Sequence, residues 1–347
     1  MQSRNEADLT QYNTLKLQSK CQLLFRINRQ EDIPQAIALA KAQGVPWFVL
    51  GGGSNVVLSE YYAGAILHMH IRGIKRELVG QAGNADNGTS DLASRAEYTV
   101  GAGENWNLFV RQSLCEGYGG LENLSLIPGT VGAAPIQNIG AYGVEVAQHI
   151  TGVTVYDTLS ESFTLLKPQD CDFGYRSSIF KRHPDRYVVC NVRFSLSKDA
   201  PYQLSYAGLA EKCDASIAGN HVNIGKVISN IRKLKLPDPA VLPNAGSFFK
   251  NPVISFTQFN SLKKQYPSVA HYPEKNAVKV AAGWLIEQAG WKGFRNEKVG
   301  IHTEQALVVV NHNGGNAADI LHLAEQVRHA VLEKFSISLE IEPVVLR

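Results

Sequence analysis

The sequence PGTVGAAPIQNIGAYG, residues 128–143, combines apolar, small and amide residues in a way that ordinary structural elements do not. A surface linker would not need Val131 or Ile136, and a core strand would not need four glycines and Pro135. An irregular buried loop is costly, because its backbone N–H and C=O groups need hydrogen-bond partners. A flat ligand supplies such partners, so we interpret this sequence as backbone wrapped around a bound ligand.

A second glycine-rich loop, Gly51-Gly52-Gly53-Ser54-Asn55, follows the apolar run Trp47–Leu50, which predicts a buried strand. A helix that Asp32 can cap and that Gly44 stops precedes this strand. Three glycines let successive N–H groups approach and cradle an anion, but a tight turn explains them equally well. The spacing is not G-x-G-x-x-G, so we do not predict a Rossmann fold.

Composition and charge argue against several classes of protein. The chain has 347 residues, 44% of them hydrophobic and 19% charged, which suits two or three domains and not global disorder. The net charge of +3 gives no support to a nucleic-acid binder. No apolar run reaches the roughly 20 residues that span a bilayer. Because Met1–Thr10 also lacks the apolar run of a signal peptide, we expect a cytoplasmic protein without a membrane partner.

Cysteine and histidine usage argues against a metal centre. The five cysteines are odd in number and lack C-x-x-C spacing, which is typical of structural thiols in a reducing compartment. Among the histidines only His68 and His70 are suitably paired, and alternation places both on one face of a strand. We expect a cross-strand structural role for this pair and no metal site.

The remaining pattern predicts helices and strands in mixture, an α+β fold. We expect a polar surface loop over residues 80–95, alternating β-rich sequence over Thr151–Ser195, and a boundary near residues 237–243. Helices are predicted at Asn105–Glu116, Thr257–Gln265, Ala281–Ala289 and Asn316–Phe335, and strands at Tyr98–Gly101, Leu307–Val310 and Ile337–Val345.

Several reactive side chains have no unambiguous role when each is taken alone. Ser247 follows a glycine, but Phe249 breaks the G-x-S-x-G pattern and no His and Asp lie in an interpretable order, so a serine hydrolase is disfavoured. Arg176 could polarise a carboxylate or be an ordinary surface arginine. The same ambiguity applies to Lys235, Glu342 and Tyr206, whose ring we expect to be solvated.

Together, these segments resemble the family of UDP-N-acetylenolpyruvoylglucosamine reductases. The resemblance extends over nearly the whole chain. It rests on YNT (12–14), GGGSN (51–55), GAGENW (101–106), IPGTVGAAPIQNIGAYG (127–143), FGYRSSIFK (173–181), KLPDP (235–239), NAGSFFKNP (244–252), AAGWLIEQAG (281–290) and LEIEP (339–343). Residues 201–210, which include Tyr206, are similar to a loop of the type I form of the family.

The resemblance implies an α+β architecture with an FAD-binding domain of the vanillyl-alcohol-oxidase type. Its two subdomains would be residues 1–75 and 76–232, followed by a substrate domain, 233–347, whose last strand returns towards the active site. NADPH would reduce the bound FAD, which would then reduce the enolpyruvyl double bond of UDP-N-acetylglucosamine enolpyruvate to give UDP-N-acetylmuramate for peptidoglycan. The expected partners are these small molecules, with no nucleic acid, and the expected state is a monomer.

The resemblance also assigns site residues. Ser247 would protonate C2 of the enolpyruvyl group, while Arg176 and Glu342 would flank its carboxylate and the developing enolate. The residues expected to contact the UDP-sugar are Tyr206, Lys235, Asn251 and Gln305, and we further expect Lys235 to support Ser247. Those expected to hold FAD are Gly51, Gly52, Gly53, Ser54, Asn55, Pro128, Gly129, Thr130, Gly132, Ala133, Gln137, Asn138, Gly140, Ala141, Tyr142 and Gly143.

The C-terminal acid departs from the family pattern. Its members usually have Val-Arg after the catalytic glutamate, whereas Pro343 and two valines follow Glu342 here. An alternative register selects Glu340, and alternation along a strand places both glutamates on one face, so parity does not decide between them. We expect Glu342 from the usual L-E-x-E pattern.

Two other functions share part of this sequence evidence. A flavin oxidase of the same cofactor-domain class would need the glycine-rich loops, but not NAGSFFKNP. A non-catalytic nucleotide-sugar or flavin-binding protein would not require Ser247, Arg176 and a C-terminal acid together.

Overall fold

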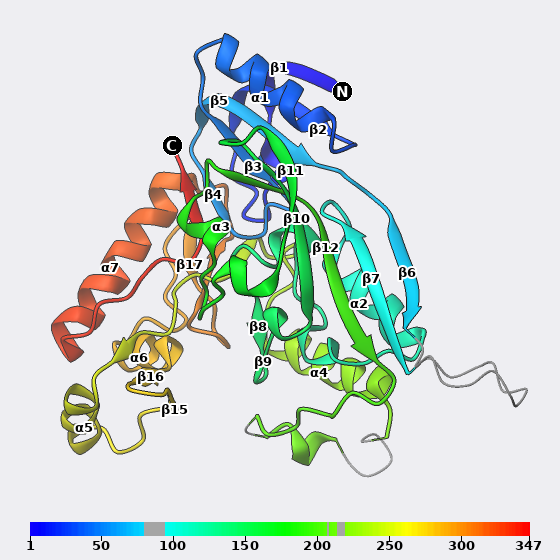
Figure 1. Cartoon of the computed structure of the whole chain (residues 1–347). Coiled ribbons are helices and arrows are strands. Elements are labelled where there is room, and N and C mark those ends of the chain that lie inside the picture. Colours follow the sequence, from blue (N-terminus) through cyan, green and yellow to red (C-terminus); the bar gives the residue numbers. More distant parts are fainter. Residues whose placement is uncertain (80–93, 207, 214–218) are drawn as a thin grey trace, which may run out of the picture. The chain divides into compact units, whose positions relative to one another are not determined.

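The computed structural model describes residues 1–79, 94–206, 208–213 and 219–347 (Figure 1). The loop predicted over residues 80–95 therefore lies almost wholly outside the described residues. The chain forms two compact units. The first contains Met1–Glu6, Leu23–Gly52 and Ala63–Arg232, and the second contains Ala7–Gln22, Gly53–Tyr62 and Lys233–Arg347.

One sheet with a parallel strand pair leads into the GGGSN loop. Its four strands run in the order β1 (Gln2–Asp8), β2 (Lys20–Ile27), β5 (Tyr61–Met69) and β3 (Trp47–Leu50). The predicted helix–strand–loop order is confirmed, with helix α1 at Asp32–Ala42 before β3. Asp32 is not the N-cap but the first helical residue, and its carboxylate accepts hydrogen bonds from the preceding backbone amides of Asn28 and Arg29.

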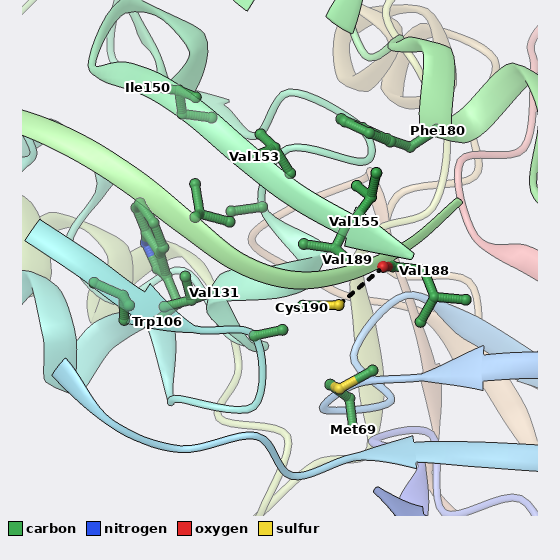
Figure 2. Close-up of a cluster of buried hydrophobic side chains, with 14 of the residues drawn as sticks. Met69, Trp106, Val131, Ile150, Val153, Val155, Phe180, Val188, Val189 and Cys190 are labelled. Atoms are coloured by element: carbon green, nitrogen blue, oxygen red, sulfur yellow. Dashed lines mark hydrogen bonds between the residues drawn. The ribbon is translucent and has the colours of Figure 1, made fainter. Parts of the chain in front are cut away.

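The first unit also contains a two-stranded pair, β8 (Gly140–Ala141) with β9 (Val144–Glu145), and a five-stranded antiparallel sheet (Figure 1). Its order is β11 (Ser162–Leu166), β10 (Ile150–Asp157), β12 (Tyr187–Ser197), β7 (Arg95–Gly101) and β6 (Ile74–Val79). The β-rich pattern predicted for this region is confirmed. Alternate side chains are buried in β12 from Asn191 to Ser197, whereas β10 buries most of its side chains. Figure 2 shows Val153, Val155 and Val189 packed in one apolar cluster with Trp106.

Three helices complete the first unit. Helix α2 (Trp106–Cys115) confirms the helix predicted at Asn105–Glu116, and the Asn105 side chain caps it by accepting from the Leu108 amide. The four-residue α3 spans Ile179–Arg182. Helix α4 (His221–Lys235) was not predicted from the sequence. It ends just beyond the passage from the first unit to the second.

The second unit contains small sheets and three helices. One sheet contains, in order, β13 (Asn244–Ser247), β18 (Val308–Asn311) and β17 (Val299–Ile301). A second sheet contains β14 (Val253–Ile254), β16 (Val278–Val280) and β15 (His271–Pro273). In a third, β19 (Val344–Leu346) pairs in parallel with β4 (Val56–Leu58). The predicted helices are confirmed as α5 (Phe256–Gln265), α6 (Ala282–Gln288) and α7 (Ala317–Phe335). The Asn316 side chain caps α7, as predicted.

The strand predicted at Ile337–Val345 is wrong over most of its length. Only β19 is a strand there, and Ile341 makes an isolated bridge with Phe249. None of the helices in the described ranges is both long and apolar enough to cross a membrane.

The buried cysteines have the structural role expected of them. Burial raises the pKa values of Cys171 and Cys190 to about 12 each, so both thiols stay protonated and unreactive near neutral pH. Cys190 lies in the cluster of Figure 2, where its thiol donates to the Val188 carbonyl.

His70 makes the cross-strand contact predicted for the pair of histidines, and His68 packs against His70. Their ring centroids lie 4.6 Å apart, and Nδ1 of His70 is 3.3 Å from Nη2 of Arg26 on β2. Burial, followed by the nearby His70, Arg26 and Arg72, lowers the pKa of His68 from 6.5 to about 4.

The low pKa of His68 predicts that stability depends on pH. Unfolding below pH 6.5 lets this imidazole take up a proton that the folded protein resists, so stability falls as the pH drops from about 6.5 towards 4. His68→Asn cannot take up this proton and is expected to reduce the fall. Thermal unfolding midpoints at pH 7.5 and 5.0 measure it. An equal drop in midpoint for both proteins would contradict the assignment.

Candidate active site

The two glycine-rich loops singled out in the sequence contact each other in the first unit. A Cβ added to Gly51 would lie 2.6 Å from Oγ1 of Thr130, and one added to Gly52 would lie 3.0 Å from Cα of Gly129. A side chain at position 51 would displace the Thr130 hydroxyl, and one at position 52 would press on the Gly129 backbone. The absence of side chains at positions 51 and 52 therefore lets the two loops approach each other closely.

The loop at residues 128–143 is anchored in the core. Val131 is fully buried and lies in the cluster of Figure 2. Its amide donates to the Glu104 carbonyl and that of Gly132 to the Ala102 carbonyl, which joins the loop to the GAGENW segment. Oε1 of Gln137 is buried and has no hydrogen-bond partner in the described part of the chain. Such an acceptor fits a ligand that brings its own donor.

Asn138 holds this loop by its side chain. The residue is 1% exposed, its amide donates to Glu145 and to the Gly174 carbonyl, and its Oδ1 accepts from the Ala147 amide. Its side chain is thus committed to protein partners. Its backbone amide also donates, to the Pro135 carbonyl. A contact of Asn138 with FAD stays a prediction.

Arg176 lies beside the same loop. It occupies a turn closed by two hydrogen bonds between Gly174 and Ser177, and its φ of +50° is unusual for a residue with a side chain. Nη2 of its guanidinium donates to the Gly140 carbonyl at 2.9 Å. The structure therefore brings together Arg176 and the predicted FAD loop.

A second arginine, Arg232 on α4, was missed in the sequence. Its Nε is buried and has no hydrogen-bond partner among the described residues. Burial lowers the pKa of its guanidinium, and nearby Arg176 lowers it further, while Tyr142 acts in the opposite direction. Two guanidinium groups near each other favour an anionic ligand. Ile224, Ile228 and Ile231, at helical spacing, could have revealed α4, but no sequence signal marks Arg232 itself.

Tyr206 is not the solvated aromatic that the sequence suggested. Its ring packs edge-on against that of Tyr142, with centroids 5.2 Å apart, in a small apolar cluster with Ile228 and Leu209. A residue expected to contact the substrate therefore touches one expected to hold FAD.

In the second unit the structure brings together Ser247 and Glu342. Ser247 is the last residue of β13 and is exposed. The backbone amide of Glu342 donates to the carbonyl of Phe248 at 2.9 Å, and Phe249 bridges to Ile341. A short antiparallel pairing thus fixes both residues in neighbouring positions.

The two C-terminal glutamates differ in their surroundings. Glu340 is exposed, and its carboxylate forms an ion pair with Lys250. Glu342 is partly buried, and its carbonyl accepts a long 3.5 Å contact from Nδ2 of Asn55. The geometry therefore favours Glu342 over Glu340 as the acid beside Ser247.

The end of the GGGSN loop belongs to the second unit. The Gly53 carbonyl accepts from the amide of Thr14 at 3.0 Å, and the Asn55 carbonyl accepts from the amide of Val344 at 3.0 Å. Ser54 lies between them and is partly buried. These contacts hold the predicted ligand loop against the YNT segment and against β19.

Asn251 and Gln305 flank the start of α6. Oδ1 of Asn251 accepts from the Ala282 amide at 2.9 Å, and Oε1 of Gln305 lies 3.2 Å from where a Cβ of Gly283 would be. Lys235 is exposed at the end of α4, and within the described residues no hydrogen bond joins it to Ser247. Among the described residues, the structure therefore shows no contact that would let Lys235 support Ser247 as expected.

Comparisons with known proteins agree with this geometry. Residues 238–346 match the family model of the UDP-N-acetylenolpyruvoylglucosamine reductase C-terminal domain, and residues 21–164 match that of an FAD binding domain. UDP-N-acetylenolpyruvoylglucosamine reductase of Polynucleobacter asymbioticus is 44% identical over 335 residues, which is 96% of this chain and 94% of that protein. The chain belongs to the UDP-N-acetylenolpyruvoylglucosamine reductase family. The resemblance noted in the sequence is thereby confirmed.

Further relatives agree with this family and its fold. The reductase of Pseudomonas aeruginosa is 41% identical over 346 residues, covering 99% of this chain and 98% of that protein. The crystal structure of the Thermus caldophilus reductase has a TM-score of 0.64 at 26% identity and covers 100% of both chains. 6-Hydroxy-D-nicotine oxidase of Arthrobacter nicotinovorans has a TM-score of 0.53 at 15% identity, covering 97% of this chain and 86% of its own, and shares the fold alone. The expected α+β fold is confirmed, and the match of residues 21–164 to the FAD binding domain model agrees with the expected FAD-binding domain.

Proposed function

We propose that this chain is a flavoenzyme that reduces the enolpyruvyl double bond of UDP-N-acetylglucosamine enolpyruvate to give UDP-N-acetylmuramate, a precursor of peptidoglycan. Its cofactor is FAD and its reductant is NADPH. The observation that carries the proposal is the bond from the Glu342 amide to the carbonyl of Phe248, which places Glu342 beside the residue that follows Ser247.

The residues of the first unit fit FAD. The contact between positions 51–52 and 129–130 leaves a bare backbone surface, and the buried Oε1 of Gln137 needs a donor. We propose that these loops, with Gly53, Ser54 and Asn55, hold the cofactor. When bound, FAD supplies the hydride for the reduction.

The side chains of this chain suit the negative charge that develops on the substrate during the reaction. Hydride addition at C3 of the enolpyruvyl group places negative charge on C2 and the carboxylate. Arg176 is held in place by its hydrogen bond to the Gly140 carbonyl and stabilises this charge. A preorganised donor of this kind lowers the activation free energy by several kcal/mol. We add Arg232, because its buried Nε, which has no partner within the ranges that the structure describes, suits the same anionic substrate.

The proton at C2 comes from the hydroxyl of Ser247. A serine hydroxyl is a weak acid, so it protonates only a strongly basic carbon, and an enolate-like C2 qualifies. Glu342, next to Ser247 through the backbone pairing, completes the acid–base group. Tyr206, Lys235, Asn251 and Gln305 are proposed to contact the UDP-sugar.

Other properties of the chain follow from the same proposal. We propose a cytoplasmic monomer that binds neither nucleic acid nor membranes. We also propose that residues 1–75 and 76–232 are the FAD subdomains and 233–347 the substrate domain.

An anaerobic experiment tests the proposed function. The purified protein is expected to carry flavin absorbance, to lose it on addition of NADPH, and to regain it when the enolpyruvyl substrate is added. Recovery with oxygen but not with this substrate would identify an oxidase instead. A protein without flavin absorbance after incubation with FAD would refute the proposal.

A further inference from the structure

A single buried amide ties the glycine-rich loop to the segment that carries Tyr206. Asn123 lies in the 3-10 turn Glu122–Leu124 and is 1% exposed. Its Nδ2 donates one hydrogen bond to the Tyr142 carbonyl and another to the Gln203 carbonyl, both at 2.8 Å. Both hydrogens of the amide are therefore used, and each holds a different piece of irregular backbone.

Both pieces need such a tie. Tyr142 has a φ of +50°, a conformation that costs a residue with a side chain roughly 1–2 kcal/mol. The Gln203 carbonyl lies in residues 201–205, which form no helix or strand. One side chain thus fixes the backbone before Gly143 and the backbone before Tyr206. The edge-on contact of Tyr142 with Tyr206, at 5.2 Å, depends on both.

We propose that Asn123 is a positioning residue that sets the place of Tyr206 for the UDP-sugar. This inference rests on the proposed function, in which Tyr206 contacts the substrate. Without the Asn123 amide, the Tyr142 carbonyl and the Gln203 carbonyl lose their common donor. Tyr206 then samples other positions, which weakens substrate binding. The proton donor, Ser247, is not affected.

The neighbouring residue provides a matched control. Glu122 lies in the same turn and is 2% exposed, and its carboxylate bonds to Nδ1 of His221 at 3.1 Å and to the Gly120 amide at 2.6 Å. These bonds hold the start of α4 and do not involve residues 142 or 203. Glu122→Gln therefore disturbs an equally buried polar group without removing the tie.

The first measurement separates KM from kcat. Asn123→Leu keeps the size of the side chain and removes both donors. Its KM for the UDP-sugar is expected to rise about tenfold, the effect of roughly one net hydrogen bond, with kcat changed less than about twofold. For Glu122→Gln the KM is expected to stay within about twofold of the wild type. Equal changes of KM in the two variants would overturn the inference.

A double-mutant cycle tests whether Asn123 acts through Tyr206. With Tyr206→Ala as the background, Asn123→Leu is expected to add little to the rise of KM, because the side chain that it positions is already gone. Additive increases would show that Asn123 acts elsewhere and would overturn the proposal.

Hydrogen exchange tests the tie without any turnover. In Asn123→Leu the amides of residues 143–144 and 203–206 are expected to exchange faster than in the wild type, and in Glu122→Gln they are not. Asn123→Ser serves if the leucine variant does not fold, since its shorter hydroxyl cannot reach both carbonyls. Unchanged exchange would overturn the inference. If the wild type fails to reduce the enolpyruvyl substrate, the proposed function fails, and exchange still decides whether the tie exists.

Discussion

Ser247→Ala is expected to slow recovery of flavin absorbance by the enolpyruvyl substrate about 10²- to 10⁴-fold, the usual contribution of a general acid. Reduction of the flavin by NADPH is expected to stay near the wild-type rate, because that step needs no proton at C2. Anaerobic stopped-flow absorbance measures the two half-reactions separately. The asymmetry between them, more than the loss of turnover, identifies Ser247 as the proton donor.

A second serine of the same unit supplies the control. Oγ of Ser255 caps α5 by accepting from the Gln258 amide at 3.2 Å. Ser255→Ala is expected to cost about 1 kcal/mol of stability and to leave both half-reactions unchanged. Equal loss in both half-reactions for Ser247→Ala would contradict the proton-donor assignment and would point to a disturbed fold around β13.

Features specified by neighbouring residues could be predicted from the sequence. Asn316 followed by an apolar stripe defines α7, and the apolar run before three glycines defines β3 and its loop. The chemistry of Ser247 came from the family resemblance, because one serine in a turn has no local signal. The sequence therefore supplied the elements and the family, but few of the contacts between them.

Features that depend on distant residues could not be predicted. Ile337–Val345 has the composition of a strand, yet only Val344 and Val345 belong to one, β19, and Glu340–Glu342 make only a short pairing with Phe248–Lys250. A strand needs a neighbour that pairs along its whole length. Asn123 acts through the carbonyls of residues 142 and 203, which only the folded chain brings to it. Arg232 is likewise notable only because its Nε is buried near Arg176 and finds no partner in the described part of the chain.

The GGGSN loop contains both local features and features that depend on distant residues, because its three glycines are needed for different physical reasons. Gly51 and Gly52 lie where a Cβ would crowd Thr130 and Gly129 of the loop at residues 128–143. Gly53 has a φ of +64°, and a Cβ added to it would lie 1.9 Å from the Tyr12 carbonyl oxygen and 2.9 Å from Cα of Asn13. Gly53 is therefore required by the packing of the chain itself, whether or not a ligand is bound.

Gly53→Ala is accordingly expected to destabilise the protein by about 3–4 kcal/mol even without FAD. About 1 kcal/mol comes from the left-handed backbone and the rest from overlap with backbone atoms that cannot easily move. They cannot move because the buried Asn13 side chain accepts from the Leu17 amide and donates to the Leu9 and Leu17 carbonyls. Urea unfolding of the apoprotein measures the loss.

Gly314→Ala separates the two contributions. Gly314 lies in the same unit with a φ of +65°, but a Cβ added there would meet no atom within 4 Å. Its replacement is expected to cost only the backbone term of about 1 kcal/mol. If the two variants lost the same free energy of unfolding, the close approach of the Tyr12 carbonyl to Gly53 would contribute nothing to the loss. The third glycine would then have to be explained by the ligand. A larger loss for Gly53→Ala in the apoprotein instead shows that the YNT segment and the GGGSN loop form one packed element before any cofactor binds.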